Sequence, residues 1–98
     1  MRYEQIAVYM MATGYQGTIY VGVTSYLTKR TYEHREHFIE GFTKKYGLSR
    51  LVYYELHETM EAAITREKRL KKYMRVQKIR LIEKSNPAWN DLFEQLTA

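Results

Sequence analysis

Two short segments near the N-terminus constrain the fold most, because each has the composition of a β-strand. They run from Ile6 to Met11 and from Thr18 to Thr24, and the stretch 14–17 between them carries a glycine at each end. β-Branched and aromatic residues on both sides of turn glycines predict a β-hairpin. In each segment one tyrosine, Tyr9 or Tyr20, falls on the face opposite the aliphatic residues. A suitable register would therefore place the two rings side by side.

A third strand and a helix are predicted next along the chain. The segment from Leu51 to Leu56 would complete a small antiparallel sheet. Ser25 or Thr28 is expected to cap a helix that runs to about Glu40. A loop with a glycine at each end follows at 41–47.

Further helices are predicted in the second half. Thr59 is a good N-cap for a helix whose apolar stripe consists of Met60, Ala63, Ile64, Leu70 and Met74. Another helix is expected over about 75–84, with its inward residues at Val76, Ile79 and Ile82, and Asn86-Pro87 would end it. The last residues form an amphipathic tail that can pack back on the core through Trp89, Leu92, Phe93 and Leu96.

The order of these elements predicts an α+β fold with a three-stranded antiparallel β-sheet flanked by helices. A chain of 98 residues is too short for two independent cores. We therefore expect a single domain over 1–98, with a core at about 5–84 and a C-terminal helical tail at 85–98.

Composition excludes several classes of protein. The chain has no cysteine, which excludes a disulfide framework, a thiolate zinc site and a cysteine nucleophile. The N-terminus lacks the apolar core of a signal peptide, and no apolar run approaches the roughly 20 residues of a membrane helix. We therefore expect a cytoplasmic protein without a membrane partner.

The chain is basic, and its charge is concentrated in two regions. The net charge is +5, with six basic and three acidic residues over 29–50 and eight basic and four acidic residues over 51–82. The eight basic residues of the second region all lie between Arg66 and Arg80. A solvated helix face would explain this run, and so would a stripe that contacts phosphates. The charge favours an anionic partner, with nucleic acid preferred to a membrane.

Glu67 is an anomaly in the second predicted helix. Extending the apolar period places this carboxylate on the core-facing stripe. A carboxylate there is costly unless it is paired or binds a cation. Two interpretations stay open: a Glu at the edge of the stripe that pairs with Arg66 or Lys71, and a carboxylate that points into a site.

Two short motifs and three later residues follow one another in a recognisable order. The motifs are Ala7-Val8-Tyr9 and Tyr20-Val21-Gly22, and Arg30, His34 and Glu67 come after them. This set resembles the GIY-YIG nuclease domain, and the resemblance spans roughly residues 5–94. It is closest to the small stand-alone bacterial GIY-YIG proteins, which share segments like 41–47, 66–72 and 86–92.

The resemblance implies an endonuclease that hydrolyses phosphodiester bonds in nucleic acid with Mg²⁺ or Mn²⁺. DNA is the favoured substrate, in repair or recombination, and a single active site implies one strand cut per event. It implies the catalytic residues Tyr9, Tyr20, Arg30, His34 and Glu67. A monomer or weak dimer is expected.

Each implied residue suits a step of the reaction. Glu67 would hold the metal, with Asn86 as a second candidate ligand. Arg30 would bind the phosphate through its planar guanidinium group. Tyr9 or Tyr20 would position or deprotonate the attacking water, and His34 would orient that water or act as general base. The implied substrate contacts are Gly22, whose missing side chain keeps room beside Tyr20, and the lysines Lys44, Lys45, Lys71 and Lys72.

One position departs from the family pattern, and two other functions compete. Repair-type relatives carry a lysine directly after the second motif, where this chain has Val23. The main alternative is a non-catalytic nucleic-acid- or protein-binding module that has kept the scaffold. The other is a basic structural protein associated with RNA or the ribosome.

Overall fold

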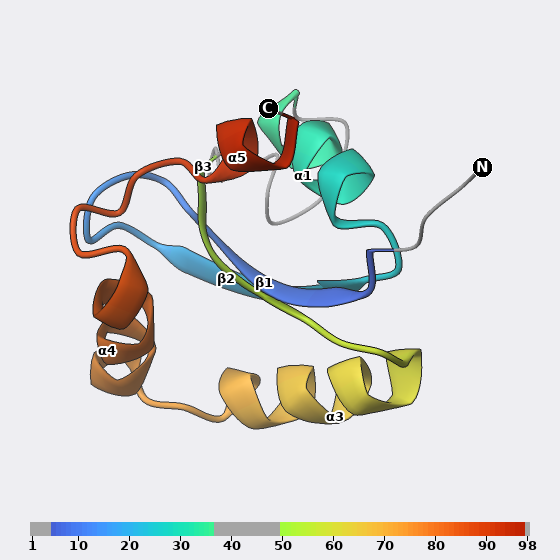
Figure 1. Cartoon of the computed structure of the whole chain (residues 1–98). Helices are drawn as coiled ribbons and strands as arrows, with labels where there is room; N and C mark the ends of the chain where they lie inside the picture. The colour runs from blue at the N-terminus through green and yellow to red at the C-terminus, as the bar shows by residue number, and fades with distance from the viewer. Residues whose placement is uncertain (1–4, 37–49, 98) are drawn as a thin grey trace.

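The computed structural model of the chain describes residues 5–36 and 50–97. The elements in chain order are β1 (Ala7–Ala12), β2 (Ile19–Thr24), α1 (Leu27–Arg35), β3 (Arg50–Leu56), α3 (Met60–Lys71), α4 (Arg75–Ser85) and α5 (Phe93–Thr97). The three strands form one antiparallel sheet between two layers of helices, with α1 and α5 on one face and α3 and α4 on the other (Figure 1). The predicted α+β class and the three-stranded sheet are confirmed.

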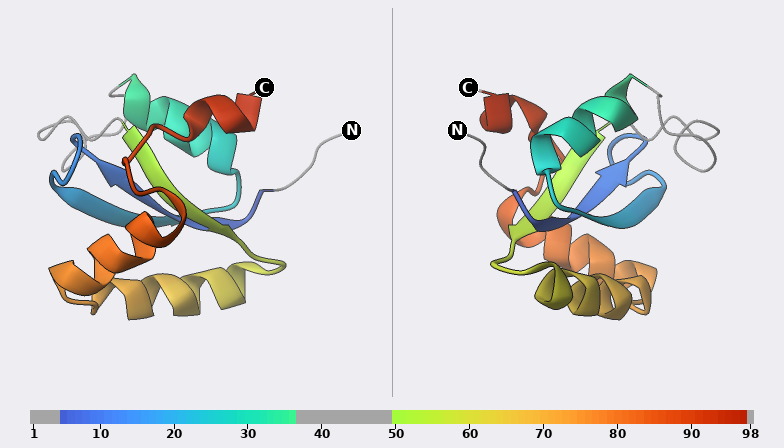
Figure 2. Two further views of the ribbon diagram at one scale, coloured as in Figure 1. Left: turned by 60° about the vertical axis from the view of Figure 1, so that its left-hand side comes forward. Right: turned by 90° about the vertical axis from the view of Figure 1, so that its right-hand side faces the viewer.

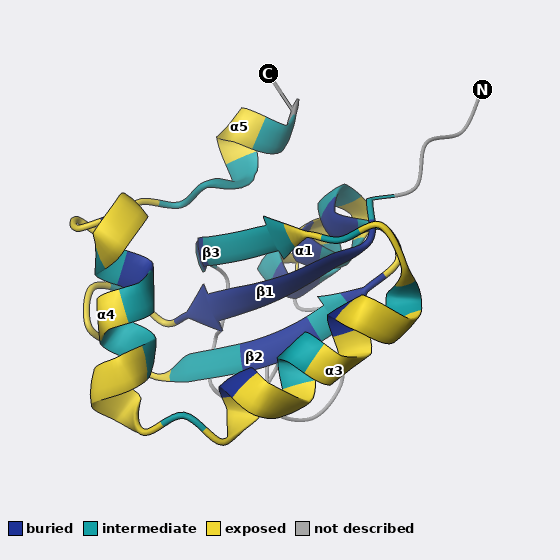
Figure 3. Ribbon diagram, turned by 60° about the horizontal axis from the view of Figure 1, so that its bottom comes forward, coloured by how far each residue is buried: buried dark blue, intermediate teal, exposed yellow. Residues whose placement is uncertain are grey.

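The sheet has the strand order β2-β1-β3, so β1 is central and all six of its residues are buried (Figure 3). In the β1–β2 register Tyr9 lies opposite Gly22, and Met11 lies opposite Tyr20. Side chains alternate between the faces of a strand, so both tyrosines and Gly22 face the same side. The predicted hairpin therefore has the register that brings the two tyrosines together.

Each face of the sheet carries its own hydrophobic cluster. The residues under α3 and α4 are Ile6, Val8, Met10, Ala12, Val21, Val52, Ala63, Leu70, Ile82 and Trp89. The cluster under α1 and α5 is smaller and consists of Ala7, Tyr9, Met11, Leu27 and Leu51. Tyr9 is thus the member of this smaller cluster that carries a polar group, so its hydroxyl is buried beside apolar side chains.

The start of α1 differs from the prediction. Its N-cap is Tyr26, whose side chain makes no capping hydrogen bond, so capping by Ser25 or Thr28 is wrong. The cap comes instead from Gln5, a residue distant in sequence. Its backbone carbonyl accepts from Leu27 N–H at 3.1 Å, and its side-chain Oε1 accepts from Thr28 N–H at 2.9 Å. A local cap was predicted because sequence patterns do not show tertiary capping groups.

The end of α1 also differs, since the helix stops at Arg35 and not near Glu40. Glu36 is the C-cap, and its backbone N–H bonds to Tyr32 O. The predicted glycine-bounded loop at 41–47 lies outside the described residues.

The helices on the other face keep most of their predicted features. Thr59 caps α3, and its Oγ1 accepts from Ala62 N–H at 3.1 Å. The apolar stripe of α3 is narrower than predicted, because Ile64 and Met74 are exposed, and Val76, predicted to face inward on the next helix, is exposed as well. The sheet covers only a thin line of α3, and Met74 lies at the junction of α3 and α4, so periodicity overestimated the buried width.

The C-terminal tail packs back on the core, as predicted. Trp89 is fully buried in the cluster under α3 and α4, whereas Leu92 and Leu96 pack against the opposite cluster. The tail therefore wraps around the β3 edge of the sheet and ends beside α1 (Figure 2). There Arg35 of α1 forms an ion pair with Asp91, and its guanidinium lies 4.7 Å from the centre of the Phe93 ring. Within the described ranges no helix is long and apolar enough to cross a bilayer.

Candidate active site

The centre of the candidate site is a hydrogen bond between the Tyr9 hydroxyl and His34 Nε2, 2.9 Å apart. Both side chains are fully buried, Tyr9 on the central strand and His34 on the inner face of α1. The Tyr20 ring lies beside them, with its centroid 6.3 Å from that of Tyr9 and 5.5 Å from that of His34. The sheet register and α1 thus bring three of the five predicted catalytic residues into one cluster.

Gly22 is the direct cross-strand neighbour of Tyr9, and its lack of a side chain lets this cluster form. A Cβ at position 22 would lie 2.5 Å from both Cζ and the hydroxyl oxygen of Tyr9, and 2.9 Å from Cε1 of Tyr20. Such contacts are well inside van der Waals distance. The space above Gly22 is therefore filled by the two tyrosine rings.

Burial sets the protonation of the buried pair. It raises the pKa of the Tyr9 phenol well above its ordinary value, with the neighbouring Tyr20 adding to the effect and Arg30 opposing it. It lowers the pKa of His34 to about 4, and the positive charge of Arg30 acts in the same direction. Both groups are consequently neutral at pH 7. In the tautomer of His34 that carries its proton on Nδ1, Nε2 accepts a hydrogen bond from the Tyr9 hydroxyl.

Arg30 lies one helical turn before His34 and faces the solvent side of the cluster. Its side chain is 43% exposed, and its Nε lies 3.4 Å from Oε1 of Glu33 on the same helix. It also lines a small polar pocket of about 130 Å³ together with Lys29 and Tyr26. Its charge lowers the pKa of His34 and opposes the rise in the pKa of Tyr9.

Glu67 approaches from the other face of the sheet. Its Oε2 lies 2.7 Å from Lys71 Nζ, and its side chain is 13% exposed against 53% for Lys71. Of the pairings left open by the sequence, the structure therefore shows the one with Lys71. The hydrogen bond to Glu67 raises the pKa of Lys71, and the phenol of Tyr20 contributes in the same direction.

The residues of the predicted site lie on both faces of the sheet. Tyr9, Tyr20 and His34 lie on the face covered by α1, whereas Glu67 and Lys71 belong to α3 on the other face. β2 is an edge strand and α3 packs against it, so the strand that carries Tyr20 and the helix that carries Glu67 are neighbouring elements. The structure thus groups three of the five predicted catalytic residues, with Arg30 one helical turn from His34 and Glu67 in the opposite helical layer.

The donor set near Glu67 fits a metal that is only partly held by protein. Among the residues with described positions, no group of three or more His, Cys, Asp or Glu could enclose an ion. Mg²⁺ is commonly held by one or two carboxylates, with waters and substrate phosphates completing its shell. A single, mostly covered carboxylate therefore fits an ion that is bound together with a phosphate.

The structure does not bring Asn86 together with Glu67. The Nδ2 of Asn86 donates to the carbonyls of Val52 and Asn90, and its Oδ1 accepts from Asn90 N–H. The amide thus fixes the tail against β3, on the edge of the sheet away from β2. Its hydrogen bonds explain why an asparagine stands before Pro87 without any metal.

The four lysines predicted to contact substrate divide into two pairs. Lys71 and Lys72 lie at the C-terminal end of α3, and both are exposed. Lys44 and Lys45 lie outside the described residues.

One ion-pair network, between α3 and β3, was not predicted from the sequence. Arg66 makes three hydrogen bonds of 2.9–3.2 Å to the carboxylate of Glu55 on β3, and Tyr53 donates to the same carboxylate. This network ties α3 to the sheet one residue before Glu67. A carboxylate at a core-facing strand position is the signal that singled out Glu67 on its helix, and it could have identified Glu55.

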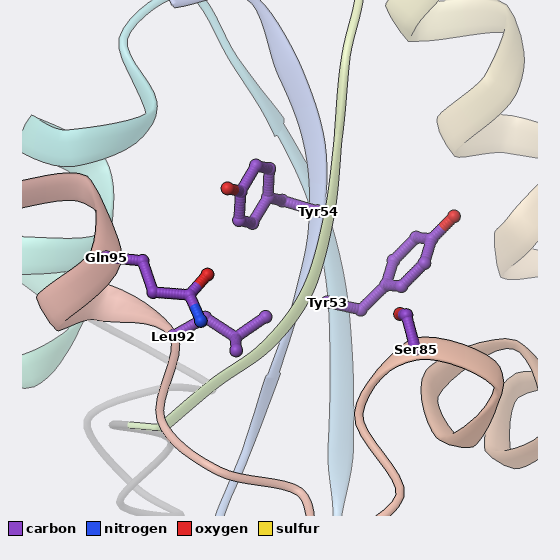
Figure 4. Close-up of a pocket in the computed structure, with 5 residues that line it drawn as sticks. All are labelled: Tyr53, Tyr54, Ser85, Leu92 and Gln95. Carbon is purple, nitrogen blue, oxygen red and sulfur yellow. The ribbon is translucent and has the colours of Figure 1, made fainter.

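A separate hollow of about 310 Å³ lies at the β3 edge, between the tail and the end of α4 (Figure 4). It is lined by Tyr53, Tyr54, Ser85, Leu92 and Gln95, and the two tyrosines point to opposite sides of the strand. None of the predicted catalytic residues lines it, so it is distinct from the candidate site.

Comparison with known proteins agrees with this arrangement. Neither a curated protein nor a solved structure matched the chain. The family model of the GIY-YIG catalytic domain matches residues 5–80, more than half of the chain. That range contains the tyrosine cluster, Arg30 and Glu67. The chain therefore belongs to the GIY-YIG catalytic domain family.

Proposed function

We propose that the protein is a metal-dependent endonuclease that cuts one strand of a nucleic acid per event, with DNA as the preferred substrate. The observation that carries the proposal is the cluster of Tyr9, Tyr20 and His34, with the half-exposed Arg30 one helical turn before His34. We also propose, from the sequence, that the protein is a single domain, a monomer or weak dimer, and cytoplasmic.

Hydrolysis of a phosphodiester needs charge compensation at phosphorus, a positioned water and a stabilised leaving oxygen. Arg30 supplies the first, because its half-exposed guanidinium can bind two non-bridging oxygens at once. The cation held by Glu67 would polarise the phosphate and stabilise the departing oxygen. Because α1 and α3 lie on opposite faces of the sheet, a substrate that meets both groups would extend around the β2 edge.

Tyr20 is the phenol of the cluster that can reach the attacking water, because it is only half-buried whereas Tyr9 and His34 are fully buried. Its hydroxyl would hold the water in line with the phosphorus. The Tyr9–His34 hydrogen bond lies directly behind the Tyr20 ring and fixes its position. Tyr9 and His34 are therefore positioning residues that do not touch the substrate.

Substrate affinity comes from charge without base readout. Lys72 lies at the C-cap of α3 beside Lys71, on the helix that carries Glu67. With Lys44 and Lys45 these lysines form the proposed substrate contacts, whereas the room beside Gly22 is taken up by the rings of Tyr9 and Tyr20. Lysine contacts to phosphates are independent of sequence and weaken with salt.

A plasmid-nicking assay tests the proposal. The wild-type protein should convert supercoiled to open-circular DNA with Mg²⁺ or Mn²⁺ and should be inactive in EDTA. Tyr20→Phe and Glu67→Gln should each lower the nicking rate by about 100-fold or more. Tyr15→Phe and Glu61→Gln are matched controls, because both residues are exposed and lie away from the cluster.

The outcomes separate the competing functions. Equal nicking by the wild type and by folded Glu67→Gln protein would indicate a contaminating nuclease and reject the proposal. Salt-sensitive DNA binding without metal-dependent nicking would instead support the non-catalytic binding module.

A further inference from the structure

The contact between Glu67 and Lys71 differs from an ordinary surface ion pair. Glutamate four residues before lysine is a favourable helical pair, but such pairs usually leave both charges in water. In this chain the Glu67 side chain is only 13% exposed, whereas the Lys71 side chain, whose ammonium lies 2.7 Å from the carboxylate, is 53% exposed. The carboxylate is thus covered, and the lysine can leave it for solvent.

The position of Lys71 conflicts with a metal at Glu67. A covered carboxylate needs a cation, and Lys71 supplies one at direct hydrogen-bond distance. A divalent ion bound at about 2.1 Å from the same carboxylate would face the ammonium at close range. The two positive groups repel each other, so one cation must leave before the other binds.

A phosphodiester offers the displaced ammonium another partner. Lys71 lies at the end of α3, which packs against the strand that carries Tyr20, and its mostly exposed side chain is accessible to a bound phosphate. The long, flexible lysine stem can turn from one oxygen acceptor to another without moving the helix. The phosphate then neutralises the lysine and also provides oxygens for the metal shell.

We propose that Lys71 occupies the cation position of Glu67 in the free protein, so that a divalent metal binds tightly only when a substrate phosphate draws the ammonium away. This inference rests on the proposed function, because it takes Glu67 as the metal ligand. It assigns Lys71 a second role besides substrate contact: it couples metal binding to substrate binding.

Mn²⁺ binding followed by electron paramagnetic resonance tests the inference without any turnover. The full chain is titrated with Mn²⁺ in the absence of nucleic acid. Lys71→Met should bind Mn²⁺ at least about tenfold more tightly than the wild type. A tenfold change is about the lower end of the effect expected when the metal no longer competes with a charge-assisted hydrogen bond. Lys68→Met is the matched control, since it removes the same charge from an exposed position of the same helix and should change the affinity less than about threefold.

A non-cleavable phosphorothioate duplex provides the second arm. It should tighten Mn²⁺ binding in the wild type by a larger factor than in Lys71→Met, because the variant has no ammonium to displace. Circular dichroism checks that each variant is folded.

The outcomes distinguish the inference from the function on which it rests. If Glu67→Gln binds Mn²⁺ as well as the wild type does in the presence of the duplex, the metal ligand is misassigned and the proposed function fails with it. If Glu67→Gln loses binding while Lys71→Met and the wild type have equal affinities, only the displacement inference fails. Equal tightening by the duplex in both proteins would also overturn it.

Discussion

The steric role of Gly22 gives the sharpest prediction for the sheet. In Gly22→Ala a methyl group would lie 2.5 Å from the Tyr9 ring and hydroxyl and 2.9 Å from Tyr20. Tyr9 cannot retreat easily, because it is fully buried and bonded to His34. One ring must move, and the hydrogen bond at the centre of the site must lengthen or break.

The net cost follows from two opposing effects. Overpacking a core by one methyl group typically costs about 1–3 kcal/mol. Gly22 does not have a left-handed backbone, so alanine also removes unfolded-state freedom and recovers about 0.4–1 kcal/mol. We expect a loss of about 1–2 kcal/mol in the free energy of unfolding, or a fall in Tm of roughly 5–15 °C for a chain of this size.

Urea and thermal unfolding followed by circular dichroism measure this cost. Gly14→Ala is the control, because a Cβ there meets nothing within 4 Å. It should leave stability unchanged or raise it slightly. The near-ultraviolet tyrosine signal should change in Gly22→Ala and not in the control. If the two variants are equally stable and their tyrosine signals match the wild type, the rings are not packed against Gly22 as described.

Three further predictions concern charged and titratable groups. His34 is buried in its neutral form with a pKa near 4, so below pH 6.5 the unfolded state binds a proton on this residue more readily than the folded state does. The free energy of unfolding should therefore fall by up to about 3 kcal/mol as the pH drops from 6.5 to 4. Urea titrations of His34→Gln should show a weaker fall. Glu55→Gln should lower the free energy of unfolding by about 1–3 kcal/mol in urea unfolding, because it weakens the bonds that tie Arg66 to β3; an unchanged midpoint would contradict this. Arg30→Lys should reduce the nicking rate by about 10–100-fold through loss of the bidentate phosphate contact, whereas Lys29→Gln should alter it only slightly; equal rates would remove Arg30 from the site.

Strand pairing and the tyrosine cluster were predictable because they depend on local alternation. Tyr9 and Tyr20 each lie opposite their own aliphatic set, and a hairpin leaves few registers that bury those sets. The register of an antiparallel hairpin then determines which side chains meet. Sequence was sufficient for this part of the site.

The features that sequence missed depend on contacts between distant segments. Gln5, in the segment before β1, accepts a hydrogen bond from the N-terminus of α1, and Glu55 on β3 binds Arg66 on α3. Neither partner has a characteristic spacing from the residue it contacts. The width of the buried stripe on α3 likewise depends on the sheet beneath it, which explains why Ile64 is exposed.

The basic run from Arg66 to Arg80 shows why counting charges overestimates a nucleic-acid surface. Arg66 is bound to Glu55, Lys71 is bound to Glu67, and Arg75 donates to two carbonyls of the hairpin turn. Three of the eight cations thus contact the protein itself. Of these, Arg66 and Arg75 hold α3 and α4 against the sheet, whereas Lys71 is the cation proposed to leave Glu67 for a phosphate. The same stretch of charge therefore positions the helices and covers the Glu67 carboxylate, and fewer of its cations are left for substrate. The salt dependence of DNA binding should consequently reflect fewer phosphate contacts than the sequence count indicates.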